Sequence, residues 1–197
     1  MLYVKFTVKD ESKYQDFQKV YDHMVMTRQP GFEFQEDGGP EFDWNSMTKE
    51  AADKAMEELN AFLNVSDEER RYLQLIPTYA QKYLSSYVEE DEKSAGVFGY
   101  QISGIFNYLE YSMEVDMNNL QIIKENMGVV EFSALAYPYG GMERFLMVLK
   151  AFDLIPIECF NGFNVCTFEW TSEFTYEIIE MPEATKEYKE KGTLFFK

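Results

Sequence analysis

The chain has little of what most catalytic, metal-binding and nucleic-acid-binding sites require. Its 197 residues include one histidine, two cysteines and 18 Lys and Arg residues. Phosphates are neutralised by clustered Lys and Arg, so this scarcity of basic side chains argues against direct binding of DNA or RNA. A closed zinc site needs four Cys or His ligands in its usual forms, and this chain cannot supply them. We therefore expect no bound metal and no other cofactor.

The single histidine also limits the catalytic chemistry that the chain can carry. His23 stands beside Asp22 in a segment that is predicted to be helical. A Ser-His-Asp or Cys-His mechanism would have to use this residue as its base, and no sequence motif places a nucleophile near it. The sequence therefore favours a binding protein over an enzyme, with His23 as an ordinary helix residue.

Long apolar segments are missing as well. The longest purely apolar run, residues 145–149, is far shorter than the roughly 20 residues needed to cross a bilayer. The N-terminal segment reaches Lys9, Asp10 and Glu11 too early to contain the apolar stretch of a signal peptide. Anionic lipids also repel an acidic surface. We expect a cytoplasmic protein that does not associate with membranes.

The two cysteines flank a predicted hairpin turn. Cys159 and Cys166 lie on either side of Asn161 and Gly162, a dipeptide typical of two-residue hairpin turns. A turn centred on this dipeptide pairs Cys159 with Asn164 and leaves the two thiols diagonal to each other. Because a disulfide needs close Cα atoms and suitably directed Cβ atoms, we predict two reduced, packed thiols.

What the chain has in abundance is acid. Its 35 Asp and Glu residues give a formal net charge of -17, while hydrophobic residues make up 46% and aromatic residues 17% of the chain. Such a content of large apolar side chains predicts a folded core beneath the acidic surface. Residues 1–93 carry 11 Lys and Arg against 20 Asp and Glu, and residues 94–197 carry 7 against 15. The resulting net charges of -9 and -8 spread the acidity over both halves.

The strongest break in composition is the acidic run at residues 89–92. It suggests a division into residues 1–93, a strand-helix start followed by a helical region, and residues 94–197, a mixed strand and helix region ending in a hairpin, although one continuous domain is the alternative. A second acidic stretch surrounds Gly38 and Gly39. Neither stretch has the Asp-x-Asp-x-Asp-Gly spacing of a calcium loop, so both are interpreted as solvated segments.

Hydrophobic periodicity predicts an α+β fold: a mainly antiparallel sheet with helices packed on one face and a helix-rich N-terminal half. The Asn161 and Gly162 turn requires antiparallel neighbours, which argues against a strictly parallel sheet. The predicted strands are residues 2–8, 105–115, 129–137, 155–160, 163–170 and 171–181, and the predicted helices are residues 12–29, 51–63, 66–76, 79–88, 118–127 and 145–152.

A stripe of tyrosines beside acidic clusters is the first candidate site. The tyrosines recur at helical spacing, which is typical of core packing but also of aromatic anchors in protein interfaces. Aromatic anchors with an acidic rim would suit the basic surface of a partner protein. The candidate partner-binding residues are Tyr79, Tyr83, Tyr87, Glu68, Glu69, Glu89, Glu90 and Asp91.

The second candidate site is a glycine-containing turn between a predicted strand and a predicted helix. Glycines let a ligand approach the backbone, and a helix N-terminus favours anions. The turn lacks the nucleotide-binding glycine motifs, so a purely structural turn is the competing interpretation. The candidate ligand-binding residues are Tyr137, Tyr139, Gly140, Gly141 and Arg144.

These observations support two hypotheses. The first is an acidic protein-binding module, such as an inhibitor or immunity-type protein that masks the basic, nucleic-acid-binding surface of a partner protein. The alternative is a small-ligand-binding protein or enzyme with a pocket near Tyr137 to Arg144. High acidity that only maintains solubility is a third interpretation.

Overall fold

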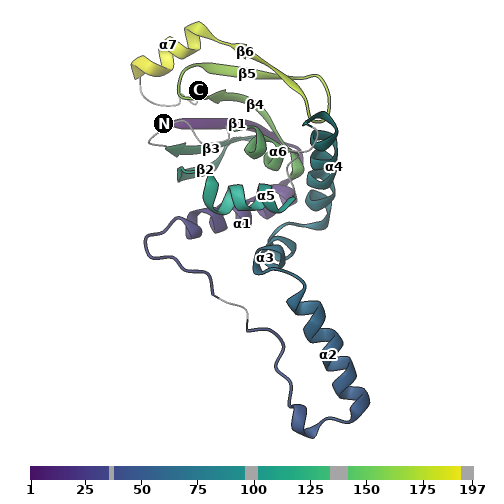
Figure 1. Ribbon diagram of the computed structural model, residues 1–197. Coiled ribbons are helices and arrows are strands. Elements are labelled where there is room, and N and C mark those ends of the chain that lie inside the picture. Colours follow the sequence, from purple (N-terminus) through teal and green to yellow (C-terminus); the bar gives the residue numbers. More distant parts are fainter. Residues whose placement is uncertain (36–37, 96–101, 134–141, 192–197) are drawn as a thin grey trace.

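The computed structural model describes residues 1–35, 38–95, 102–133 and 142–191. It contains a six-stranded antiparallel sheet with the strand order β2-β3-β1-β4-β5-β6 (Figure 1). The predicted α+β class with a mainly antiparallel sheet is confirmed. The strands are β1 (Leu2–Val8), β2 (Asp116–Lys124), β3 (Met127–Ser133), β4 (Leu154–Phe160), β5 (Val165–Trp170) and β6 (Tyr176–Glu180).

The helices are concentrated before β2, so the helix-rich N-terminal half is also confirmed. Two short helical turns, η1 (Trp44–Ser46) and the π-helical η3 (Tyr108–Ser112), accompany the longer helices. The α-helices are α1 (Glu11–Thr27), α2 (Lys49–Leu63), α3 (Asp67–Leu75), α4 (Thr78–Ala95), α5 (Ile102–Asn107), α6 (Glu143–Ala151) and α7 (Pro182–Lys191).

Strand β1 lies in the middle of the sheet because its inward face is wholly apolar. Val4 and Phe6 are fully buried, and β1 pairs with β3 on one side and β4 on the other. One continuous cluster of buried residues therefore includes β1 and the strands that follow residue 93.

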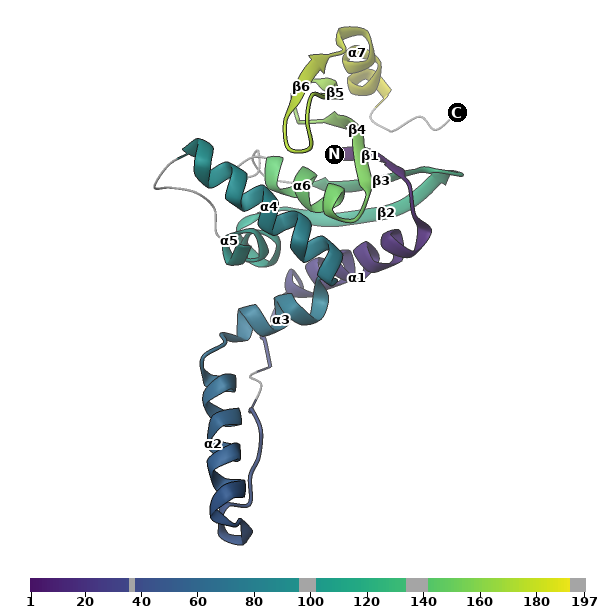
Figure 2. The same ribbon diagram turned by 90° about the vertical axis from the view of Figure 1, so that its right-hand side faces the viewer.

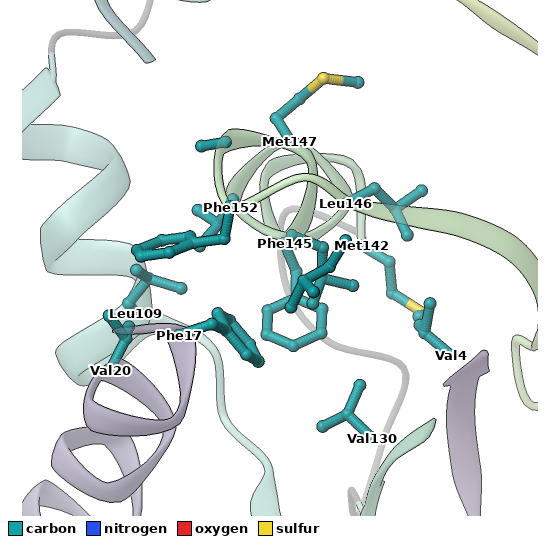
Figure 3. Packing of buried hydrophobic residues seen from close by; sticks show 14 of the residues in the cluster. Val4, Phe17, Val20, Leu109, Val130, Met142, Phe145, Leu146, Met147 and Phe152 are labelled. Atoms are coloured by element: carbon teal, nitrogen blue, oxygen red, sulfur yellow. The ribbon is translucent and has the colours of Figure 1, made fainter. Parts of the chain in front are cut away.

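The main core lies between the sheet and a layer of helices. Phe17 of α1 meets Phe145 of α6 edge to face at 6.4 Å, and Phe145 reaches Phe132 of β3 at 5.9 Å between ring centres. Figure 3 shows Phe145 on the side of α6 that faces Phe17 of α1 and Val130 of β3, whereas Met147 lies on the opposite side of the helix. Such tight interdigitation of large side chains accounts for the main stabilising contribution of the body.

Helix α7 packs against the opposite face of the sheet. Tyr3 alternates with Val4 along β1 and so points away from the main core. The Tyr188 ring lies 5.3 Å from the Tyr3 ring and 4.6 Å from the Phe160 ring. The Thr185 hydroxyl accepts a hydrogen bond from the Val165 amide at 2.8 Å, which fixes α7 to β5.

Two predicted elements have the wrong secondary structure. Residues 105–115, predicted as a strand, form α5 and η3, because Ile105 and Leu109 also match the four-residue spacing of a helix face. Residues 118–127, predicted as a helix, form β2 and the turn that leads into β3. Asn118 and Asn119 do not favour strands, but backbone pairing with β3 overrides that preference.

The β4–β5 hairpin exists, but its predicted register is wrong. Phe160 pairs with Val165 and Cys159 directly with Cys166, so the connection has four residues. The Asn161 side chain closes this loop, since its Oδ1 accepts hydrogen bonds from the Phe163 and Asn164 amides. A side-chain-closed loop replaces the two-residue turn, and both buried thiols are free.

Candidate protein-interaction surface

A long projection leaves the body between α1 and α3. We call residues 33–66 the arm: its outgoing part leads to η1 at the far end, and α2 returns towards α3 (Figures 1 and 2). The arm carries nine Asp and Glu against two Lys, a net charge of -7 out of -17 for the whole chain. Seven of these acids lie in the described part of the arm, which therefore carries a net charge of -5.

Local sequence signals define the returning helix of the arm. Thr48 caps α2 by accepting a hydrogen bond from the Ala51 amide at 3.3 Å. Beyond the end of α2, Ser66 caps α3 by accepting a hydrogen bond from the Glu69 amide at 3.1 Å. Thr48 is thus the side-chain cap of α2 itself, whereas Ser66 caps the helix that follows it.

Gly39 on the outgoing side of the arm closely approaches Phe62 of α2 on the returning side. A Cβ atom at Gly39 would lie 2.7 Å from Cε1 of Phe62, so only glycine allows this approach, and its φ of +74° is in the left-handed region. The Arg70 guanidinium lies 3.8 Å from the centre of the Phe62 ring. Phe42 packs edge to face on Trp44 at 5.2 Å.

Large apolar side chains remain exposed on the arm. Trp44 is 43%, Met56 49% and Leu63 67% exposed, and Ala55 is the buried residue of α2. The sequence predicts one apolar face for this helix, yet the described residues of the body leave Met56 and Leu63 uncovered. Exposed aromatic and methionine side chains among charges are enriched in protein-binding surfaces.

A buried carboxylate holds the base of the arm against the body. Glu110 on η3 is 2% exposed and accepts two hydrogen bonds from Arg71, at 2.9 Å from Nε and 2.8 Å from Nη2. His23 Nε2 lies 2.8 Å from Glu110 Oε1, and an ionised carboxylate only accepts, so the histidine donates. Burial alone would raise the pKa of Glu110, but these hydrogen bonds outweigh it and lower that pKa.

The cluster of Glu110, Arg71 and His23 lies close to both ends of the arm. The Arg71 guanidinium lies 3.9 Å from the ring centre of Phe34, at the outgoing end, while Arg71 itself belongs to α3, just after the returning end. His23 stacks on Phe106 at 6.0 Å. Helices α1 and α3 and the π-helical turn η3 are therefore joined at one point, and π-helical turns are frequent at functional sites.

The predicted tyrosine stripe faces the body. Tyr79 packs on Phe152 and donates to Asp16 at 3.1 Å, whereas Tyr83 packs on Phe174. Tyr87 is 4% exposed and also contacts Phe174. Burial is the main cause that raises the pKa of both Tyr79 and Tyr83. These rings act as packing residues of α4 and offer a partner little accessible area.

The predicted acidic residues lie on the outer side of the same helices. Glu68 is half-buried and Glu69 exposed in the first turn of α3, where negative charge favours the helix dipole. Glu89 and Glu90 are exposed and Asp91 is half-buried near the end of α4. Glu68 and Glu69 line a cavity that α3 shares with α4, so the structure brings them next to the Tyr87 helix without exposing its ring.

Most of the alternative candidate site lies outside the described residues. Four of its five residues are outside the described ranges: Tyr137, Tyr139, Gly140 and Gly141. Arg144 is half-buried at the start of α6, and its guanidinium lies 5.6 Å from the ring centre of Tyr108. The ligand pocket near this turn stays a prediction.

Sequence reasoning missed the arm and the cluster at its base. The exposed face of α2 has the same periodicity as a core face, so composition alone cannot tell them apart. Arg71 is 39 residues and His23 87 residues from Glu110 in sequence, and no local spacing connects them. The exposed Trp44 close to an acidic stretch was the available signal.

Comparisons with protein-family models, curated proteins and solved structures found no match. Among the described residues, none of the helices combines the length and apolarity that crossing a membrane requires. The same residues contain no group of three or more His, Cys, Asp or Glu side chains arranged to hold a metal ion.

Proposed function

We propose that the protein is an acidic protein-binding module whose arm docks on the basic surface of a partner protein. The observation that carries this proposal is the arm itself: a projection with a net charge of -7 on which Trp44, Met56 and Leu63 are exposed. Negative charge steers the encounter with a basic surface, and the apolar side chains supply area to be buried after contact.

The partner surface that fits this chemistry is one that otherwise binds nucleic acid. Nucleic-acid-binding surfaces are rich in Lys and Arg, and an acidic arm presents carboxylates where such a surface would meet phosphates. The proposed consequence is inhibition by masking, with association that slows as salt screens the charges. Glu68, Glu69, Glu89, Glu90 and Asp91 extend the acidic surface towards α4.

Comparative affinity capture with matched variants tests this proposal. The wild-type protein, an arm variant (Glu57→Lys with Glu58→Lys) and a control with the same charge change on α7 (Glu183→Lys with Glu190→Lys) are used to capture proteins from the source's lysate. All four substituted positions are exposed. We expect one basic protein to be retained by the wild type and the control, lost by the arm variant, and displaced by added duplex DNA.

A second variant separates apolar contact from charge. Met56→Ser with Leu63→Ser leaves the net charge unchanged and should shorten the lifetime of the complex while sparing its salt-dependent association rate. Identical captured proteins for the arm variant and the control, or capture that duplex DNA does not affect, would contradict the proposal.

A further inference from the structure

A cavity of about 630 Å³ lies between α3, α4 and α5. Its volume is in the range of small-molecule sites. Figure 2 shows α3 meeting the start of α4, with α5 beside it, and the arm leading away from this corner. Its apolar wall is formed by Leu73 of α3, Val88 of α4, and Ile102 and Phe106 of α5.

One buried polar group in the cavity wall lacks a hydrogen-bond partner. Tyr72 is 7% exposed, and its hydroxyl has no partner within the part of the chain that the structure describes. Its ring packs edge to face on Phe106 at 5.6 Å. Burying a hydroxyl without a hydrogen bond is unfavourable, so a polar group on a bound molecule would stabilise this arrangement. Burial raises the pKa of Tyr72 to about 12, which keeps the hydroxyl protonated at neutral pH.

The mouth of the cavity is acidic. Glu68 accepts a hydrogen bond from Asn107 Nδ2 at 2.9 Å, and Glu69 is exposed next to the half-exposed Leu73. Neither glutamate has a salt-bridge partner within the described ranges. Glu68 is within electrostatic range of the Arg71 guanidinium, and two carboxylates at the rim of an apolar cavity still leave a net negative charge there, which favours a ligand that carries a positive charge.

We infer that this cavity binds a small amphipathic cation, with its apolar body between α3, α4 and α5 and its ammonium group at Glu68 and Glu69. The inference is independent of the proposed function, since it concerns a small molecule and not a protein partner. An anion of the same shape would meet both glutamates and be repelled. A neutral molecule of the same shape would keep the apolar contacts and lose the charge contact.

Three probes of one shape test the chemistry of the site: 4-phenylbutylamine, 4-phenylbutanol and 4-phenylbutyrate. Each is titrated into the full-length protein by calorimetry and by amide NMR shifts. We expect saturable 1:1 binding of the amine with shifts at Leu73, Ser85 and Ile102, and binding of the acid weaker by at least about tenfold. Equal binding of the amine and the acid, or no saturable binding at all, would overturn the inference.

Variants locate the binding. Glu68→Gln with Glu69→Gln should weaken the amine about tenfold and leave the alcohol unchanged, because only the charge contact is removed. Leu73→Trp should block both probes, and Tyr72→Phe tests the contribution of the hydroxyl. The matched control, Glu57→Gln with Glu58→Gln on α2, removes the same charge far from the cavity. If that control weakens the amine equally, the amine is attracted by overall acidity and the site is refuted.

Discussion

Helices α6 and α2 use similar apolar residues in opposite ways. Every residue of α6 from Phe145 to Ala151 is buried, including Lys150, whereas in α2 Ala55 is the buried residue. Helix α6 is held by the side chains around it, and α2 by its Thr48 cap and its helix-favouring Ala, Glu, Lys and Leu residues. The difference teaches that the body supplies the global stability, while the arm is a locally stabilised element on which an interaction surface can be displayed.

The largest expected change in the free energy of unfolding comes from a substitution in the body. Phe145→Ala should lower the free energy of unfolding by about 3–5 kcal/mol, because it removes a fully buried ring and leaves a cavity. Urea unfolding followed by circular dichroism measures this loss. A loss below about 1 kcal/mol would mean that α6 does not anchor the core.

The next largest change in the free energy of unfolding is expected at the junction between the arm and the body. Glu110→Gln removes the negative charge that Arg71 and His23 share, and should cost about 2 kcal/mol because the half-buried Arg71 guanidinium loses its charge-assisted hydrogen bonds. Hydrogen exchange should rise at the base of the arm, near Phe34. Glu114→Gln, an exposed residue just after η3, is the matched control and should change neither quantity.

The pH dependence of this junction has a definite sign. The pKa of Glu110 is below the ordinary value of 4.5, so the folded protein binds its proton less tightly than the unfolded chain. The contribution of Glu110 is complete above that ordinary value and is lost as the pH falls through the lowered pKa. Unfolding curves of the wild type and Glu110→Gln should therefore differ most near neutral pH and converge in acid. A constant difference at every pH would contradict this role.

A smaller loss of stability is expected for a substitution that affects the arm and leaves the body unchanged. Gly39→Ala places a Cβ against Phe62 at a left-handed backbone angle and should destabilise the arm by about 1 kcal/mol. Amide exchange in residues 42–64 should then rise about fivefold while global unfolding is unchanged. Gly38→Ala is the control, because its Cβ would meet nothing within 4 Å.

The smallest effect is on the exposed face of α2. Met56→Ala should change the free energy of unfolding by less than about 0.5 kcal/mol, since the side chain is half exposed and alanine favours the helix. The same variant should weaken binding of the captured partner. If Met56→Ala destabilised the protein as much as Phe145→Ala, the distinction between arm and body would fail.

The sequence predicted the elements whose signals are local. The alternation of Leu2, Val4, Phe6 and Val8 defines β1, and the Ser66 and Glu69 pattern defines the start of α3. At Ile105 and Leu109 the periodicity matches both a strand and a helix, and the π-helical turn that follows has no clear sequence signature.

The candidate site was harder to predict because its contacts are not local. Whether the apolar face of α2 is covered depends on how the arm leaves the body, and hydrophobic spacing does not contain that information. Glu110 becomes distinctive only when the fold brings Arg71 and His23 to it. The acidic residues were identifiable by composition, but the tyrosines chosen beside them pack inward.

The facing pair Cys159 and Cys166 makes the chain well suited to site-directed labelling. Both side chains are buried, and burial raises the pKa of the Cys159 thiol to about 12 and also raises that of Cys166. Protonated, inaccessible thiols react slowly with maleimides. A cysteine introduced at the exposed Asn60 of α2 would therefore take up a fluorophore selectively without removal of the native pair, and the emission of that fluorophore could report in real time when a partner covers the arm.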